Sequence, residues 1–178
     1  MKVQAVAPGI ETGEFLPGAQ FADAYGLALE DPALSARQAT EKMWGSSQGW
    51  MNALMAVRNL VVTPFGLKTP AQGRTGSRNA IGIFPVVSEA PNRVVVGFDD
   101  KHLDFRVIVD AAPTGNGRLV TATTLVRTHN LLGRAYLAAV LPFHRVIVRA
   151  MLRRLLAQRP EVRPSRNAFC LVRRFLCR

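Results

Sequence analysis

The fold of this chain is decided by three consecutive segments, HLDFRVIVDA (102–111), PTGNG (113–117) and LVTATTLVRT (119–128), and by the apolar stretch that follows them. In the first and third segments apolar and polar residues alternate, as in β-strands with one buried face. The Gly-rich segment between them is typical of a hairpin turn. After His129 the apolar period changes from two to 3.6, which predicts a helix. We therefore predict a sheet with one apolar face and a helix that covers it, which is how a chain of this size could enclose a ligand.

Two further strands precede these, and tight turns are predicted at residues 89–90, 100–101 and 115–116. The turns would set three cross-strand pairs: Val87 with Asn92, Phe98 with Leu103, and Val109 with Ala122. One face then collects a mostly apolar set: Ile81, Ile83, Val87, Val94, Val96, Phe98, Leu103, Phe105, Val107, Val109, Ala122, Thr124 and Val126. The other face collects Phe84, Arg93, Val95, Asp99, His102, Asp104, Arg106, Ile108, Asp110, Thr121, Thr123, Leu125, Arg127 and His129. Three separately chosen turns agree on one apolar face, so we predict an antiparallel meander.

The last predicted element is a helix of roughly 26 residues, about 39 Å long, capped by Asn130. Its apolar side faces the sheet and holds Leu132, Tyr136, Val140, Phe143, Ile147 and Met151. Its Arg residues, namely Arg134, Arg145, Arg149 and Arg153, fall on the opposite side and are expected to face water. Pro142 removes one helical hydrogen bond and predicts a kink.

Upstream, residues 1–18 are rich in Gly and Pro and predict an irregular lead-in. Residues 19–29 predict an edge strand, and helices are expected over 34–44 and 50–62. On the second helix Trp50 recurs with Leu54 at helical spacing beside two Met residues, which suits a pocket lining as well as ordinary core packing. The loop over 68–79 lacks the spacing of a phosphate-binding loop.

The composition is that of one folded domain, with 178 residues, 48% apolar and 20% charged. The longest uninterrupted apolar run, residues 136–143, is far shorter than the roughly 20 residues of a membrane span. Because the first residues do not resemble a secretory signal, we expect a cytoplasmic protein. Cys170 and Cys177 are read as free thiols, no His lies near them, and neither a metal nor a cofactor is expected.

The net charge of +11 is unevenly placed. Residues 149–178 hold nine Arg and one Glu, a net charge of +8, which leaves +3 for the rest of the chain. Nucleic-acid binding is therefore not expected. The terminal segment RNAFCLVRRFLCR (166–178) is either a basic amphipathic element that weakly contacts anionic membrane or an acidic partner, or a docked or frayed terminus.

The sharpest polar constellation lies on the second face of the sheet. The hairpin register places Asp104 opposite Arg127 and His102 opposite His129, with Arg106 next along the strand. One reading is an anion or polar-substrate site in which Arg binds a carboxylate or phosphate and His moves protons. The alternative is a solvent-facing ladder of cross-strand ion pairs, and we favour it.

A second candidate position is His144, on or beside the helix face that meets the sheet, near Tyr136. A lone His there more often satisfies a backbone carbonyl, and the Tyr136 ring suits the core. No Ser or Cys stands in a recognisable nucleophile elbow and no carboxylate pair is spaced for acid–base chemistry, so no catalytic residue is assigned.

Three stretches together resemble an uncharacterised bacterial family, the domain of unknown function numbered 2867: GFDDKHLDFRVIV (97–109), TTLVRTHNLLGRAYLAAVLPFHRVIVRAMLRR (123–154) and WMNALMAVRNLVVTPFGLK (50–68). The HLDFR, HN–GR–Y and PFHR segments carry the resemblance, which covers about residues 19–156. It implies an α+β, START-like helix-grip fold (SRPBCC-like): a curved antiparallel sheet, two N-terminal helices and a long kinked C-terminal helix. Residues 19–157 would form that domain and residues 158–178 an Arg-rich extension. Similar domains occur behind NAD(P)-binding oxidoreductase domains, but the family lends no activity.

Three functions remain open. The first is a binding module that holds an apolar or amphipathic molecule between meander and final helix, lined by Trp50, Val96, Phe105, Val107, Tyr136 and Phe143. The second is an enzyme, or an accessory of a separate oxidoreductase, which predicts His102, Arg106 or His144 in a cleft. The third is a membrane- or protein-interaction element driven by the basic tail.

Overall fold

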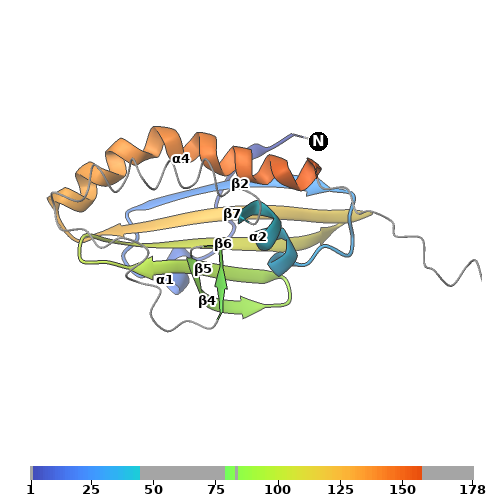
Figure 1. The fold of residues 1–178 in the computed structure, drawn as a ribbon, viewed down its shortest axis with the longest axis horizontal. Helices are drawn as coiled ribbons and strands as arrows, with labels where there is room; N and C mark the ends of the chain where they lie inside the picture. Colours follow the sequence, from blue (N-terminus) through green and yellow to red (C-terminus); the bar gives the residue numbers. More distant parts are fainter. Residues whose placement is uncertain (1, 45–78, 83, 158–178) are drawn as a thin grey trace, which may run out of the picture.

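The computed structural model describes residues 2–44, 79–82 and 84–157. They form an α+β structure with a seven-stranded antiparallel sheet in the order β1-β2-β7-β6-β5-β4-β3 (Figure 1). The strands are β1 (Gln4–Val6), β2 (Phe21–Leu29), β3 (Ala80–Ile81), β4 (Phe84–Ala90), β5 (Arg93–Asp99), β6 (Leu103–Thr114) and β7 (Gly117–Thr128). The helices are α1 (Thr12–Phe15), α2 (Ala36–Trp44) and α4 (Leu131–Ala157). The predicted meander and final helix are confirmed, whereas Trp50, its predicted helix, most of the 68–79 loop, Ile83 and the tail lie outside the described residues.

The β6–β7 hairpin has the predicted register, with Val109 opposite Ala122. Its turn is tight because Gly115 adopts a φ of +46°, a left-handed conformation that costs Gly little and other residues more. The hairpin therefore sets the two longest strands side by side, and the other elements assemble on them.

Two other turns differ from the prediction. Strand β4 turns into β5 at Pro91 and Asn92 rather than at residues 89–90, because Pro favours the second position of a turn. Between β5 and β6 the loop is longer than predicted, so that Phe98 faces Phe105 and not Leu103. That shift is two residues, and a shift of two keeps every side chain on its predicted face.

A register irregularity in β4, between Val86 and Ser88, changes the faces of that strand. Val87 was predicted to be in the core but is exposed. Phe84, predicted on the polar face, packs instead with Val86 against the main apolar cluster. The prediction for β4 was therefore wrong, because simple alternation fails across a bulge.

The lead-in is not irregular. Strand β1 pairs with β2, so β2 is a strand as predicted but not the edge of the sheet. Leu16 and its neighbours pack on Val95, Ile108 and Leu125, which are buried. This second apolar cluster lies on the sheet face that we predicted to be polar, and the lead-in covers it.

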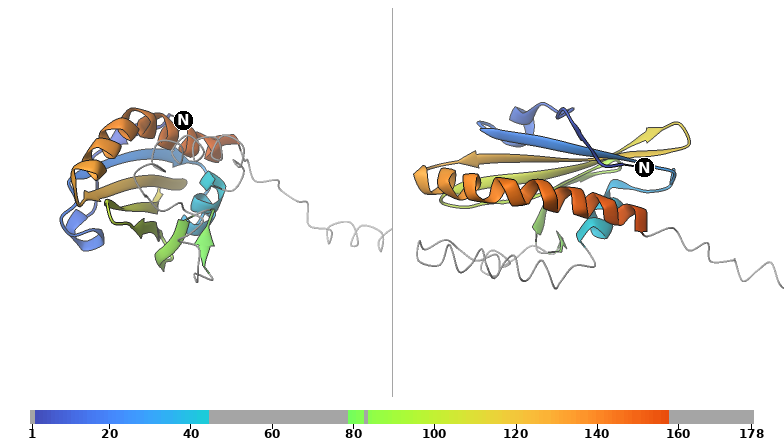
Figure 2. Two further views of the ribbon diagram at one scale, coloured as in Figure 1. Left: turned by 60° about the vertical axis from the view of Figure 1, so that its left-hand side comes forward. Right: turned by 90° about the horizontal axis from the view of Figure 1, so that it is seen from above.

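The opposite face, here called the helix-side face, is covered by α2 and α4 (Figure 2). Helix α4 runs for 27 residues and continues through Pro142 without ending. Its Arg134, Arg145, Arg149 and Arg153 are exposed, as predicted. Its buried residues are Gly133, Val148, Met151, Leu152 and Leu155, so the buried stripe is rotated from the predicted one. Phe143, predicted to face the sheet, is 62% exposed.

Gly133 lets α4 approach the sheet. A Cβ at this position would lie 2.0 Å from the carbonyl oxygen of His102. Asn130 caps the helix as predicted, since its Oδ1 accepts a hydrogen bond of 2.9 Å from the Gly133 amide. The start of α4 is therefore held against the loop between β5 and β6.

By length and composition α4 could also cross a membrane, the one such helix in the part of the chain that the structure describes. Long core helices of soluble proteins meet the same criterion. In this structure α4 packs along the sheet with one side and leaves the other side exposed.

Candidate functional site

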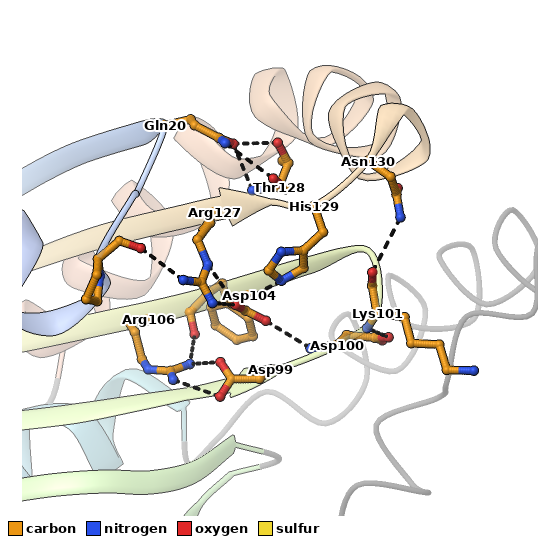
Figure 3. A network of polar contacts seen from close by, with 12 residues as sticks. Gln20, Asp99, Asp100, Lys101, Asp104, Arg106, Arg127, Thr128, His129 and Asn130 are labelled. Atoms are coloured by element: carbon orange, nitrogen blue, oxygen red, sulfur yellow. Dashed lines mark hydrogen bonds and ion pairs between the residues drawn. The ribbon is translucent and has the colours of Figure 1, made fainter.

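Asp104 is the centre of the polar network that the hairpin register predicted (Figure 3). It is 2% exposed. Its Oδ2 accepts hydrogen bonds from Arg127 Nη2 at 2.6 Å and Nε at 3.0 Å, and lies 2.9 Å from His129 Nε2. Its Oδ1 accepts one from the Asp100 amide at 3.2 Å. Both carboxylate oxygens are thus satisfied.

The electrostatics of Asp104 follow from these partners. Burial by itself raises the pKa of the carboxyl group, but the hydrogen bonds from His129 and Arg127, and then their charges, lower it. The net result is a pKa below the ordinary value for Asp. Asp104 is therefore a paired carboxylate and not an acid poised to release a proton at neutral pH.

The Arg residues of this network are bound to acceptors within the protein. Arg127 Nη1 donates to the carbonyl of Pro17 at 3.1 Å. Arg106 donates to the Phe105 carbonyl at 3.0 Å and pairs with Asp99 at 2.7 Å. In this structure both guanidinium groups therefore serve internal ion pairs and hydrogen bonds. The network differs from a solvent-facing ladder in that its central carboxylate is buried.

His102 does not join Asp104. Its backbone carbonyl accepts a hydrogen bond of 2.9 Å from the His129 amide, which confirms that the two residues lie opposite each other, as predicted. Its ring points to the start of α4, where Nδ1 lies 2.9 Å from Asn130 Nδ2. Together with the bond from the Thr128 amide to Gln20 at 2.8 Å, these contacts tie the end of the sheet to the residue before β2 and to α4.

A different pair lies on the helix-side face. His144 Nε2 of α4 donates to Asp23 Oδ1 of β2 at 3.0 Å, and both side chains are 17% exposed. The ring of Phe21 meets the His144 ring edge to face, with centroids 6.1 Å apart. We call this pair the Asp23–His144 dyad.

The dyad is incompletely satisfied. Asp23 Oδ2 is buried and has no hydrogen-bond partner among residues 2–44, 79–82 and 84–157. Thr124 lies opposite Asp23 in the β2–β7 register, and its Oγ1 is buried without a partner in the same ranges. Asp23 and Thr124 thus each direct a polar atom into an apolar face from adjacent strands. Residues that face each other in this way have Cβ atoms about 5 Å apart.

Sequence reasoning missed Asp23, although a signal was present. In FADAYGLAL (21–29) alternate residues face α4, and four of these five are apolar. An acid at the second inward position breaks the pattern. Charged groups are costly to bury without a partner, so an acid at such a position indicates a paired or ligand-binding side chain.

Around the dyad the helix-side face is aromatic and aliphatic. Across the sheet from Asp23 and Thr124 come Val107 and then Val96, in register. Next to this row Phe98 and Phe105 pack edge to face at 4.5 Å, and Phe84 lies 5.2 Å from Phe105. Of the predicted lining residues, Val96 is fully buried, and Phe105, Val107 and Tyr136 are partly buried. Phe143 points outward and cannot line this face.

A family model described as "Protein of unknown function (DUF2867)" matches residues 15–151. The chain belongs to this family. No curated protein matches it. A solved structure, CalU16 from Micromonospora echinospora, is similar at 12% identity over 75% of this chain and 80% of that one, with a TM-score of 0.29. A likeness at this TM-score does not define a shared fold. Within the described ranges of this DUF2867 protein no group of three or more His, Cys, Asp or Glu residues could hold a metal.

Proposed function

We propose that this DUF2867 protein is a binding module of helix-grip type, and that it holds an amphipathic small molecule on the helix-side face, beside α4. The apolar part of the ligand would contact Phe98, Phe105 and Val107. Its polar end would donate a hydrogen bond to Asp23 Oδ2 and form a second hydrogen bond with the Thr124 hydroxyl.

The observation that carries the proposal is the pair of buried, unpartnered oxygen atoms of Asp23 and Thr124. Each such group costs about 1–3 kcal/mol when it is left without a hydrogen bond. A ligand hydroxyl or amine could satisfy both atoms, because it can donate to the carboxylate while the Thr124 hydroxyl is also in reach. A carboxylate ligand would instead meet Asp23 as a like charge.

The chemistry of the polar end can be tested with three ligands that share one chain: decanol, decylamine and decanoate. Their binding is measured by displacement of a fluorescent anilinonaphthalene probe from the full-length protein. We expect decanol and decylamine to bind about tenfold or more tightly than decanoate, which corresponds to about 1.4 kcal/mol. Equal affinities, or a preference for decanoate, would contradict the role of Asp23.

Asp23→Asn is the matching variant, because it removes the charge and keeps the shape. It should reduce the preference for decylamine over decanoate. Asp110→Asn is the control, since Asp110 is also a strand acid paired with a cation, Arg93, but lies on the opposite face. A control that shifts the preference as much as Asp23→Asn would show that overall charge governs binding.

A second candidate, an enzyme or an accessory of a separate oxidoreductase, is favoured by the dyad itself. A carboxylate that holds a His ring in one orientation is a common arrangement for proton transfer. His102 and Arg106 do not support this alternative, since both are engaged in the structural network.

Mass spectrometry of a ligand recovered from the purified protein separates the two functions. A binding module returns the ligand chemically unchanged after incubation. Conversion that is lost in His144→Gln, with binding retained, would establish catalysis and replace the binding-module proposal.

A further inference from the structure

The outer side of α4 is apolar where a surface helix is ordinarily polar. Leu131, Phe143 and Val146 are 79%, 62% and 68% exposed. The intervening outward positions are small or apolar as well: Ala135, Ala138, Ala139 and Pro142, all exposed. The stripe from Leu131 to Val146 is about 22 Å long at 1.5 Å per residue.

Arg residues border and continue this stripe. Arg134 and Arg145 flank it and Arg153 follows it along the helix, all of them exposed. Arg149 is exposed as well, but its guanidinium packs over the ring of Tyr25. Helix α4 contains no Asp or Glu in its 27 residues. All the charged residues that α4 itself places beside its apolar stripe are thus positive.

These positive charges favour one kind of binding partner for the outer side of α4 over another. A second copy of the chain, docked through α4, would place Arg against Arg with no acid on either helix to pair with them. An anionic lipid surface fits both features, because its headgroups pair with Arg while apolar side chains enter the acyl boundary.

We propose that the outer side of α4 docks on an anionic membrane surface, with Phe143 and Val146 inserted and Arg134 and Arg145 at the headgroup phosphates. The helix would lie in the plane of the interface. This geometry keeps Val148, Met151, Leu152 and Leu155 packed on the sheet, and no other described helix or strand covers the outer side (Figure 2). The surface includes no residue of the tail, 158–178, and none of the residues proposed to bind the small molecule.

The test is flotation of the full-length protein with vesicles of phosphatidylcholine alone, or with about 30 mol % phosphatidylglycerol. The wild type should bind the anionic vesicles and not the neutral ones. Binding should weaken as salt rises from about 0.1 M to 1 M, because the screening length falls from about 10 Å to 3 Å. Equal binding to both vesicles, or none to either, would overturn the proposal.

Paired variants locate the surface. Phe143→Ser/Val146→Ser should weaken binding about tenfold or more, and the control Val87→Ser/Leu119→Ser, which changes exposed apolar residues of the sheet, should not. Arg134→Gln/Arg145→Gln should weaken it about 30-fold at about 1 kcal/mol per charge. Lys2→Gln/Lys101→Gln removes the same charge elsewhere and should have little effect. The proposal fails if the α4 variants bind normally while Arg173→Gln/Arg174→Gln, in the tail, abolishes binding.

Discussion

The two faces of the sheet each carry an acid with a His partner and little exposure to water, yet the two acids are satisfied differently. Asp104 has hydrogen-bond partners for both oxygens: a guanidinium, an imidazole and a backbone amide. Asp23 has His144 on one oxygen, and the described residues leave the other oxygen unpartnered. A saturated network holds a structure together, whereas an unsaturated one has capacity left for a ligand. The contrast assigns stability to Asp104 and binding to Asp23.

The largest expected effect comes from Asp104→Asn. It leaves Arg127 and His129 without their shared carboxylate, and we expect the free energy of unfolding to fall by about 3 kcal/mol, measured by urea denaturation. Asp99→Asn, which breaks a more exposed pair with Arg106, should cost less than about 1 kcal/mol. If the two variants lose the same free energy of unfolding, the burial of Asp104 does not make its ion pairs more important for stability than the exposed pair.

The same carboxylate predicts an acid dependence. Because the pKa of Asp104 is lower in the folded protein than in the unfolded chain, its contribution is fully present above the ordinary Asp pKa of about 3.9. The contribution is lost as the pH falls through the lower, folded pKa. The stability difference between wild type and Asp104→Asn should therefore be constant from neutral pH down to about pH 5 and shrink below about pH 4. A difference that already shrinks between neutral pH and pH 5 would contradict this role of the Asp104 carboxylate.

A smaller effect, of opposite sign, is expected for the dyad. Asp23→Leu/His144→Leu removes a part-buried Asp–His pair in which one carboxylate oxygen has no partner among the described residues, so the free energy of unfolding should stay unchanged or rise by about 1 kcal/mol. Binding of decanol should be lost in the same protein. A fall in stability as large as that of Asp104→Asn would show that the dyad stabilises the fold. The difference in role between Asp23 and Asp104 would then disappear.

The Asp104 network could be predicted from the sequence, whereas the Asp23–His144 dyad could not. Alternation with a Gly-Asn turn was enough to place Asp104 opposite Arg127, because a tight hairpin determines its register locally. The lead-in and β4 escaped prediction for separate reasons. Packing of Leu16 on Val95 depends on contacts distant along the chain, and a β-bulge reverses the faces of β4.

The dyad could not be predicted because it joins β2 to the middle of α4. No local pattern tells which turn of a long helix lies over a given strand. The predicted stripe placed Phe143 inward and His144 on or beside that face; the structure turns Phe143 outward and places His144 against Asp23. The acid within the apolar pattern of β2 was visible, but its partner depended on tertiary packing.

The most direct test of the central claim compares two neighbouring threonines. Thr123 and Thr124 both have a buried hydroxyl without a partner in the described residues, and they face opposite sides of the sheet. Thr123→Val and Thr124→Val should change stability alike, by less than about 1 kcal/mol. In a calorimetric titration with decanol, we predict that Thr124→Val weakens binding about tenfold and that Thr123→Val binds like the wild type. Equal affinities in the two variants would contradict a ligand site on the helix-side face.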